Sequence, residues 1–111
     1  MPRLYIIGPV TGMPNANFGA FESARARLMG RGYEAITPHD FISDGIPWPE
    51  AMRVSINVLT RYEKGGRLYD GVAMLPGWED SEGARLEKLV AEACGIPCRT
   101  VDEWMEAADV D

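Results

Sequence analysis

Short apolar runs alternate along the chain with longer segments in which apolar residues recur every three or four positions. The short runs are typical of buried strands, and the longer segments are typical of amphipathic helices. Strands are predicted at residues 3–7, 33–37, 71–75 and 96–100. Helices are predicted from Asn17 to Gly30, at about 50–62, from Ser81 to Gly95 and at 101–108, with an irregular loop at 39–49.

The apolar positions of each helical segment define the face that we expect to pack on a sheet. Asn17 and Ser81 are expected to cap the first and third helices, and the glycine tract at 64–67 is expected to end the second. The expected inward-facing residues are Phe18, Phe21, Ala24 and Leu28, then Met52, Ile56 and Leu59, then Leu86, Leu89, Val90 and Ala93, and last Trp104 and Met105.

Strands that alternate with helices predict right-handed crossovers and a parallel sheet covered on both faces. We therefore expect one α/β domain over residues 1–111, a flavodoxin-like (Rossmann-like) three-layer sandwich with a four- to five-stranded parallel sheet in the order 2-1-3-4. In that order the first and third strands are neighbours, so the turns at 8–12 and 77–83 open side by side. Folds of this kind bind ligands at such a switch point.

Composition narrows the choice of partners. A chain of 111 residues with 46% apolar content builds a modest core, and a homodimer or higher homo-oligomer is expected because so small a domain exposes much of its surface. The net charge of −6 argues against binding a nucleic-acid polymer or an anionic membrane. No signal-like segment and no apolar run of about 18 residues is present, so a cytoplasmic protein without a membrane span is predicted.

Few side chains suit a soft metal. Cys94 and Cys98 are separated by a predicted helix end, and His39 is the only histidine, so free thiols and no metal site are expected. His39 and Asp40 are adjacent, but no serine or cysteine elbow accompanies them. Flavin binding would rest on the fold class alone, and no cofactor is expected.

Glu87 is the candidate reactive group. The neighbours three and four positions away on its helix include no basic residue, and Gly83 is expected to leave the carboxylate open to a ligand on one side. Ser81 adds a hydroxyl at the helix start, where free N–H groups favour a phosphate or carboxylate. The alternatives are a solvated helix glutamate and a serine that only caps.

Two further features surround this turn. The loop of residues 8–12 has two glycines and Thr11, which can bring N–H groups near an anion, although it matches no phosphate-binding fingerprint. Trp48 and Trp78 fall in predicted loops, where each would plug the core, enter a dimer interface or stack on a flat base. Tyr5, near the end of the first strand, is expected to reach Glu87.

Three segments together resemble the nucleoside 2-deoxyribosyltransferase-like superfamily, and in particular a short bacterial and phage branch of it. They are residues 5–12, the stretch from Trp48 through Met52 and Arg53, and the run from Asp70 through Leu75-Pro-Gly-Trp78 and Ser81 to Glu87. The resemblance covers nearly the whole chain. It implies the flavodoxin-like fold and a nucleoside or nucleotide ligand, without a cofactor.

The resemblance also implies roles for individual residues. Glu87 would attack the anomeric carbon as a carboxylate nucleophile, and Tyr5 would orient it. Ser81 matches the serine of the similar 2′-deoxynucleoside 5′-monophosphate N-glycosidases, which favours a phosphorylated substrate. The implied substrate-binding residues are Gly8, Pro9, Thr11, Gly12, Ser55, Trp78, Ser81 and Gly83.

Two positions depart from the superfamily. Ser55 stands where these enzymes usually carry a carboxylate that faces the ribose or the leaving base, and Thr11 stands where the first loop often carries an arginine or another polar group. The first hypothesis is therefore cleavage or transfer of an N-glycosidic bond of a deoxynucleoside or its 5′-monophosphate. The second is a non-catalytic nucleotide-binding or sensor module with the same fold.

Overall fold

Four parallel strands form the central sheet of the computed structural model, which describes residues 2–63 and 66–109. Their order is β2-β1-β5-β6, which is the predicted order 2-1-3-4 when the strands of this sheet are numbered alone. The predicted α/β class and topology are confirmed. The strands are β1 (Arg3–Ile7), β2 (Glu34–Ile36), β5 (Gly71–Met74) and β6 (Cys98–Thr100).

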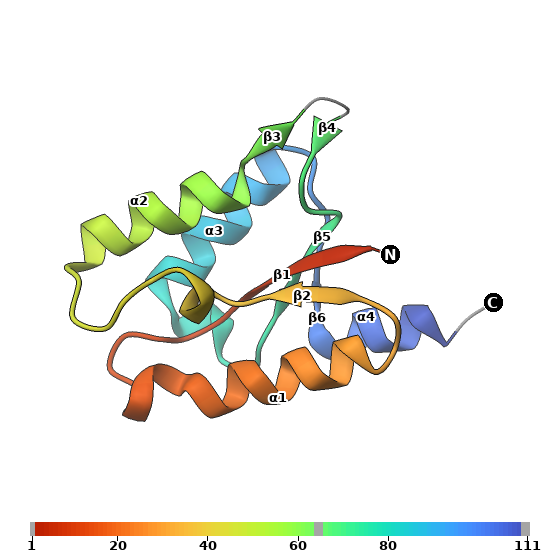
Figure 1. Cartoon of the computed structure of the whole chain (residues 1–111), viewed down its shortest axis with the longest axis horizontal. Helices are drawn as coiled ribbons and strands as arrows, with labels where there is room; N and C mark the ends of the chain where they lie inside the picture. Colours follow the sequence, from red (N-terminus) through yellow and green to blue (C-terminus); the bar gives the residue numbers. More distant parts are fainter. Residues whose placement is uncertain (1, 64–65, 110–111) are drawn as a thin grey trace.

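Helices cover both faces of the sheet, with α1 and α4 on one side and α2 and α3 on the other (Figure 1). The four are α1 (Phe18–Met29), α2 (Trp48–Leu59), α3 (Glu82–Ala93) and α4 (Val101–Ala108). Single turns of 3-10 helix precede three of them: η1 (Pro14–Asn17), η2 (Pro38–Asp40) and η3 (Trp78–Asp80). No helix in the described part of the chain is long and apolar enough to cross a membrane.

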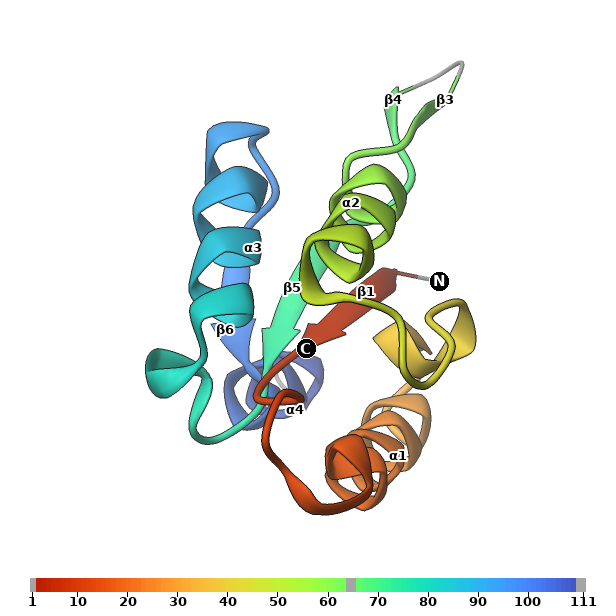
Figure 2. The same cartoon turned by 90° about the vertical axis from the view of Figure 1, so that its left-hand side faces the viewer.

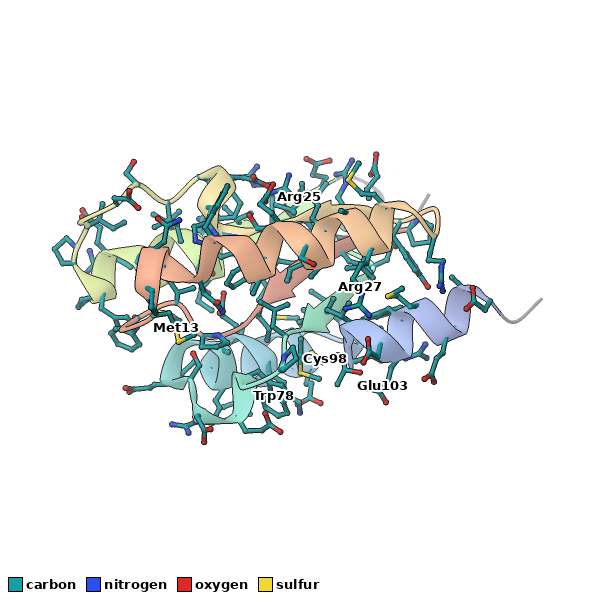
Figure 3. All side chains as sticks on the ribbon, turned by 90° about the horizontal axis from the view of Figure 1, so that it is seen from below. Met13, Arg25, Arg27, Trp78, Cys98 and Glu103 are labelled. Carbon is teal, nitrogen blue, oxygen red and sulfur yellow. The ribbon has the colours of Figure 1, made fainter. Side chains whose placement is uncertain are left out.

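Alternation along β1 divides the core into two halves, because successive side chains of a strand point to opposite faces. Leu4 and Ile6 pack with residues of α1 and α4, whereas Tyr5 and Ile7 pack with residues of α2 and α3. On the first side Arg27 reaches from α1 to α4 and pairs with Asp102 at 2.7 Å (Figure 3).

Trp104 closes the α1/α4 side. Its ring lies so close to Gly71 that a Cβ built on this glycine would come within 2.3 Å of it. The indole N–H donates to the carbonyl of Val72 at 2.8 Å, and Tyr33 donates to the carbonyl of Trp104 at 2.8 Å. A buried indole and phenol are thus both satisfied by the backbone, as burial of polar groups requires.

The predicted bounds of the second helix were wrong at both ends. The second helix begins at Trp48, two residues earlier than expected, since Trp48 and Pro49 occupy its first turn, where proline is well tolerated. It ends at Leu59, and a small antiparallel hairpin of β3 (Tyr62–Glu63) and β4 (Gly66–Arg67) follows and projects beyond α2 (Figures 1 and 2). Of the predicted helix-ending tract, residues 64–65 lie outside the described residues.

The predicted face of the third helix was also wrong. Leu86 is 39% exposed and Leu89 64% exposed, and Ala93 is exposed as well. The face of α3 that packs inward instead carries Ala84, Glu87 and Ala91. These positions also follow the helical period, and their two alanines let the α3 backbone approach its neighbours closely. The helix is turned so that a carboxylate, rather than two leucines, faces the interior.

Candidate active site at the carboxyl end of the sheet

A cavity of about 620 Å³ opens where the strands β1, β2 and β5 end. Its wall is built from the loop after β1, the segment around η2, one face of α2, and the first turns of α3. This is the switch point at which the sequence predicted a ligand site. The volume falls in the range of small-ligand pockets, so it can hold a molecule of nucleoside size.

Glu87 lies in the wall of this cavity and is only 8% exposed. Ser55, on α2, is 3% exposed and donates its hydroxyl proton to Oε2 of Glu87. The Tyr5 hydroxyl lies 2.8 Å from the Ser55 hydroxyl. Tyr5 therefore reaches Glu87 through Ser55 rather than directly. Glu87 has no basic partner on its own helix, as expected, but it accepts this hydrogen bond from α2.

The chemistry of the three groups determines which of them donates in each hydrogen bond from Tyr5 through Ser55 to Glu87. A serine hydroxyl can donate one hydrogen bond, and Ser55 donates it to Glu87. The Tyr5 hydroxyl must therefore be the donor in its hydrogen bond with Ser55. Oε2 of Glu87 is thereby held as an acceptor. Oε1 has no hydrogen-bond partner within residues 2–63 and 66–109, which leaves it available to a molecule in the cavity.

Burial controls the ionisation of the chain. Loss of solvent raises the pKa of Glu87 to about 7, although the hydrogen bond from Ser55 acts in the opposite direction. Burial, together with the charge of Glu87, also raises the pKa of Tyr5, which stays a neutral donor. Glu87 is therefore a carboxylate whose charge changes near neutral pH, a property common among reactive groups.

The loop of residues 8–12 is held in place by contacts with Leu75 and Asn17. A Cβ on Gly8 would lie 2.8 Å from Cβ of Leu75, so the glycine lets the ends of β1 and β5 approach. Gly8, Pro9 and Thr11 line the cavity, but Gly12 does not. Asn17 occupies the N-cap position of α1 in a left-handed conformation and makes no side-chain cap. Its amide instead donates to the carbonyl of Pro9 at 2.9 Å.

Ser81 is confirmed as the cap of α3, because its hydroxyl accepts from the N–H of Ala84 at 3.2 Å. It also lines the cavity. Gly83 lines the cavity too, but the space beside it is filled: a Cβ there would lie 3.3 Å from Sδ of Met52 and 3.8 Å from the indole nitrogen of Trp48. The glycine thus lets α2 and α3 pack closely, and does not uncover Glu87 as expected.

The two tryptophans lie in different places. Both were predicted in loops, but Trp48 begins α2 and Trp78 begins η3. Trp48 lines the cavity, whereas Trp78 does not. Trp78 packs against the core below α3, under the ammonium group of Lys88 at 5.4 Å, and η3 lies on the outer side of α3 (Figure 2). Figure 3 shows Trp78 on the same side of the molecule as Cys98.

Sequence reasoning missed part of the wall. Met52 was expected to pack inward, but it lines the cavity beside Trp48 and Ser55. The three share a face of α2 at the spacing i, i+4, i+7, a signal that was available from the sequence, yet of the three only Ser55 was predicted to bind the substrate. Ile42 and Ile46 belong to the irregular segment after η2, where no periodicity marks them. His39 also lines the wall, and its Nε2 lies 2.9 Å from the carbonyl of Ala16, so this hydrogen bond joins η2 to η1.

A protein-family model matches residues 2–100 of this chain, and its description is a domain of unknown function, DUF4406. The chain belongs to the DUF4406 family. The match spans β1 to β6 and so includes every residue of the Tyr5–Ser55–Glu87 chain of this DUF4406 protein. Neither the curated proteins nor the solved structures include a significant match to it.

Proposed function

We propose that this protein cleaves or transfers the N-glycosidic bond of a deoxynucleoside or of its 5′-monophosphate, with Glu87 as the nucleophile. The observation that carries the proposal is a buried carboxylate in the wall of a cavity of about 620 Å³, with one oxygen held by Ser55 and the other without a hydrogen-bond partner among the described residues. The resemblance of residues 5–12 and 70–87 to the nucleoside 2-deoxyribosyltransferase-like superfamily supports the choice of substrate.

The chemistry proceeds in two displacements. Oε1 of Glu87 attacks the anomeric carbon, the bond from that carbon to the base breaks, and the base leaves with the electron pair and takes up a proton from solvent. The sugar is then held as an ester of Glu87. Water attacks the same carbon to give hydrolysis, or a second base attacks it to give transfer. The bond from that carbon to Glu87 breaks, the electron pair returns to the carboxylate, and the attacking group loses a proton to solvent.

The residues around Glu87 have separate tasks in this scheme. Tyr5 and Ser55 hold Oε2, so the rotamer of Glu87 is fixed before the substrate arrives. Trp48, Ile42, Ile46 and Met52 supply an apolar wall against which a flat base can pack. The nucleophile must be ionised, and a pKa of about 7 leaves roughly half of Glu87 ionised at neutral pH.

The test is a panel of deoxynucleosides and their 5′-monophosphates, with release of free base followed by chromatography. Glu87→Ala should lower the rate by about a thousandfold or more, because the covalent route is lost. Mass spectrometry of quenched enzyme should show the sugar on Glu87. Glu92→Gln is the matched control, since Glu92 is exposed on the same helix and pairs with Lys88. An unchanged rate in Glu87→Ala would remove Glu87 from the mechanism.

A second candidate is a nucleotide-binding or sensor module without turnover. The observation in its favour concerns Ser55, which stands where the superfamily offers a carboxylate to the ligand. Ser55 donates its hydrogen bond to Glu87 instead. Such a module should be stabilised by its ligand, by about 2.7 kcal/mol at 100 times the dissociation constant. Thermal stabilisation by a nucleoside or nucleotide without release of base would favour this candidate.

We also propose that the protein acts in the cytoplasm as a homodimer or higher homo-oligomer. The support is the outward apolar face of α3, where Leu86 and Leu89 are exposed on a small protein. Light scattering coupled to size-exclusion chromatography gives the mass in solution, and Leu89→Glu should lower it if α3 lies in the interface.

A further inference from the structure

The charges around the cavity are of one sign. Among the described residues that line it, Asp44, Asp80, Glu82 and Glu87 are acidic, and none is a lysine or an arginine. His39 is the one basic side chain of the wall, and its Nε2 is bound to the carbonyl of Ala16. Among the described residues of the wall, these carboxylates therefore have no lysine or arginine beside them to compensate their charge.

The carboxylates stand where an anion would otherwise dock. Asp80 ends η3 and Glu82 begins α3, so they flank Ser81 at the N-terminus of the helix. The partial positive charge of that terminus is already opposed by these acidic side chains. The Ser81 hydroxyl accepts from the N–H of Ala84, so one of the donors of the first turn is used within the protein.

Arginines on or beside the elements of the wall do not line the cavity. Arg85, on the first turns of α3, donates to the backbone carbonyl of Glu79 at 2.9 Å and is not part of the cavity wall. Arg25, on α1, is bound to Thr37 and pairs with Asp40. Sites for phosphate esters commonly place arginine or lysine beside the helix N–H groups, and neither lines this wall in the part of the chain that the structure describes.

We infer that the substrate of this site is a nucleoside without a phosphate, and that the acidic rim of Asp44, Asp80 and Glu82 disfavours 5′-monophosphates. The inference rests on the proposed function and narrows it. It replaces the expectation, drawn from Ser81 alone, of a phosphorylated substrate: the serine is present, but it caps α3 between two carboxylates. A neutral ribose hydroxyl can instead donate to such a carboxylate.

The experiment compares kcat/KM for the common 2′-deoxynucleosides with kcat/KM for their 5′-monophosphates. With the wild-type chain the nucleosides should be favoured by about tenfold or more. In the double variant Asp80→Asn, Glu82→Gln, kcat/KM for the monophosphates should rise, so the preference for nucleosides should become smaller. Added salt should narrow it in the wild type, because exposed charges are screened. Glu79→Gln is the matched control, since Glu79 is exposed, adjacent and outside the cavity wall.

Each outcome decides something. Equal or better use of monophosphates by the wild type would overturn the inference and leave the proposed function standing. A ratio that the double variant does not move, with circular dichroism showing a folded protein, would overturn the acidic rim as its cause. If neither class is turned over, and calorimetry detects binding of neither, the proposed function fails and the inference fails with it.

Discussion

The two sides of the sheet differ in the polarity of their buried side chains. The α1/α4 side is an apolar core in which the polar atoms of Tyr33 and Trp104 are satisfied by backbone carbonyls. The α2/α3 side contains Ser55 and Glu87, which with Thr37 are the buried polar or charged side chains of the described residues. Because an ionised carboxylate is costly to bury, the second side gives up stability that the first side retains.

The largest effect on stability is expected on the α1/α4 side. Phe21 is fully buried there, so Phe21→Ala should lower the free energy of unfolding by about 3–5 kcal/mol through lost burial and a residual cavity. Urea unfolding followed by circular dichroism measures it. The pKa of Glu87 should not move, since the two residues lie on opposite faces of the sheet. A shifted pKa would mean that the two sides are coupled.

The next effect concerns Glu87→Gln, which should raise the free energy of unfolding at high pH, whereas Phe21→Ala lowers it. The pKa of Glu87 is raised in the folded state from 4.5 to about 7. A raised pKa contributes stability that is complete below about pH 4.5 and is lost as the pH rises to about 7. The loss corresponds to about 3 kcal/mol. Glu87→Gln cannot ionise and should escape it.

The measurement is urea unfolding of both proteins from pH 4.5 to pH 8. The stability of Glu87→Gln relative to wild type should rise across this range, and every other titrating group cancels in the comparison. Glu92→Gln should run parallel to the wild type. Parallel curves for Glu87→Gln would show that Glu87 is not a strained carboxylate, and the contrast between the two sides of the sheet would lose its basis.

The smallest effect is expected at Ser55, which acts through Glu87 as a positioning residue. Ser55→Ala leaves the Tyr5 hydroxyl and Oε2 of Glu87 without their partner, at a cost of about 1–3 kcal/mol. It also removes a bond that lowers the pKa of Glu87, so that pKa should rise further. A carbon-13 NMR titration of the Glu87 carboxyl measures the change. Ser55→Thr keeps the hydroxyl and should restore the wild-type value, and a titration unchanged in Ser55→Ala would contradict the hydrogen-bond chain.

Features that depend on residues close together in the sequence were predicted better than features that depend on packing between distant residues. The four strands of the central sheet and the Ser81 cap depend on local patterns, so they were predicted, whereas the hairpin of β3 and β4 was not. The order of the sheet followed from the crossovers that alternating strands and helices require. The inward face of α3 was not, because the rule that apolar residues face inward favoured Leu86 and Leu89 over Ala84. Close packing selected the small side chain instead.

The site was predicted in part for the same reason. Tyr5, Ser55 and Glu87 were each singled out, and the cavity at the switch point was expected. The bond between Ser55 and Glu87 could not be predicted, since it joins residues 32 positions apart and depends on how α2 is rotated against α3. Trp78 was expected beside the ligand, but the turn of η3 carries it to the other side of α3.

Gly71 has a consequence for how the sequences of homologues that also contain the last helix can vary. The Trp104 ring occupies the space that any side chain at position 71 would need, and the indole is tied to Val72 by its N–H. A larger residue at 71 can be accepted only where position 104 has become smaller. These two positions, 33 residues apart in the chain, should therefore change together among homologues, and the pair offers a way to recognise in an alignment which chains close their last helix over the sheet in this manner.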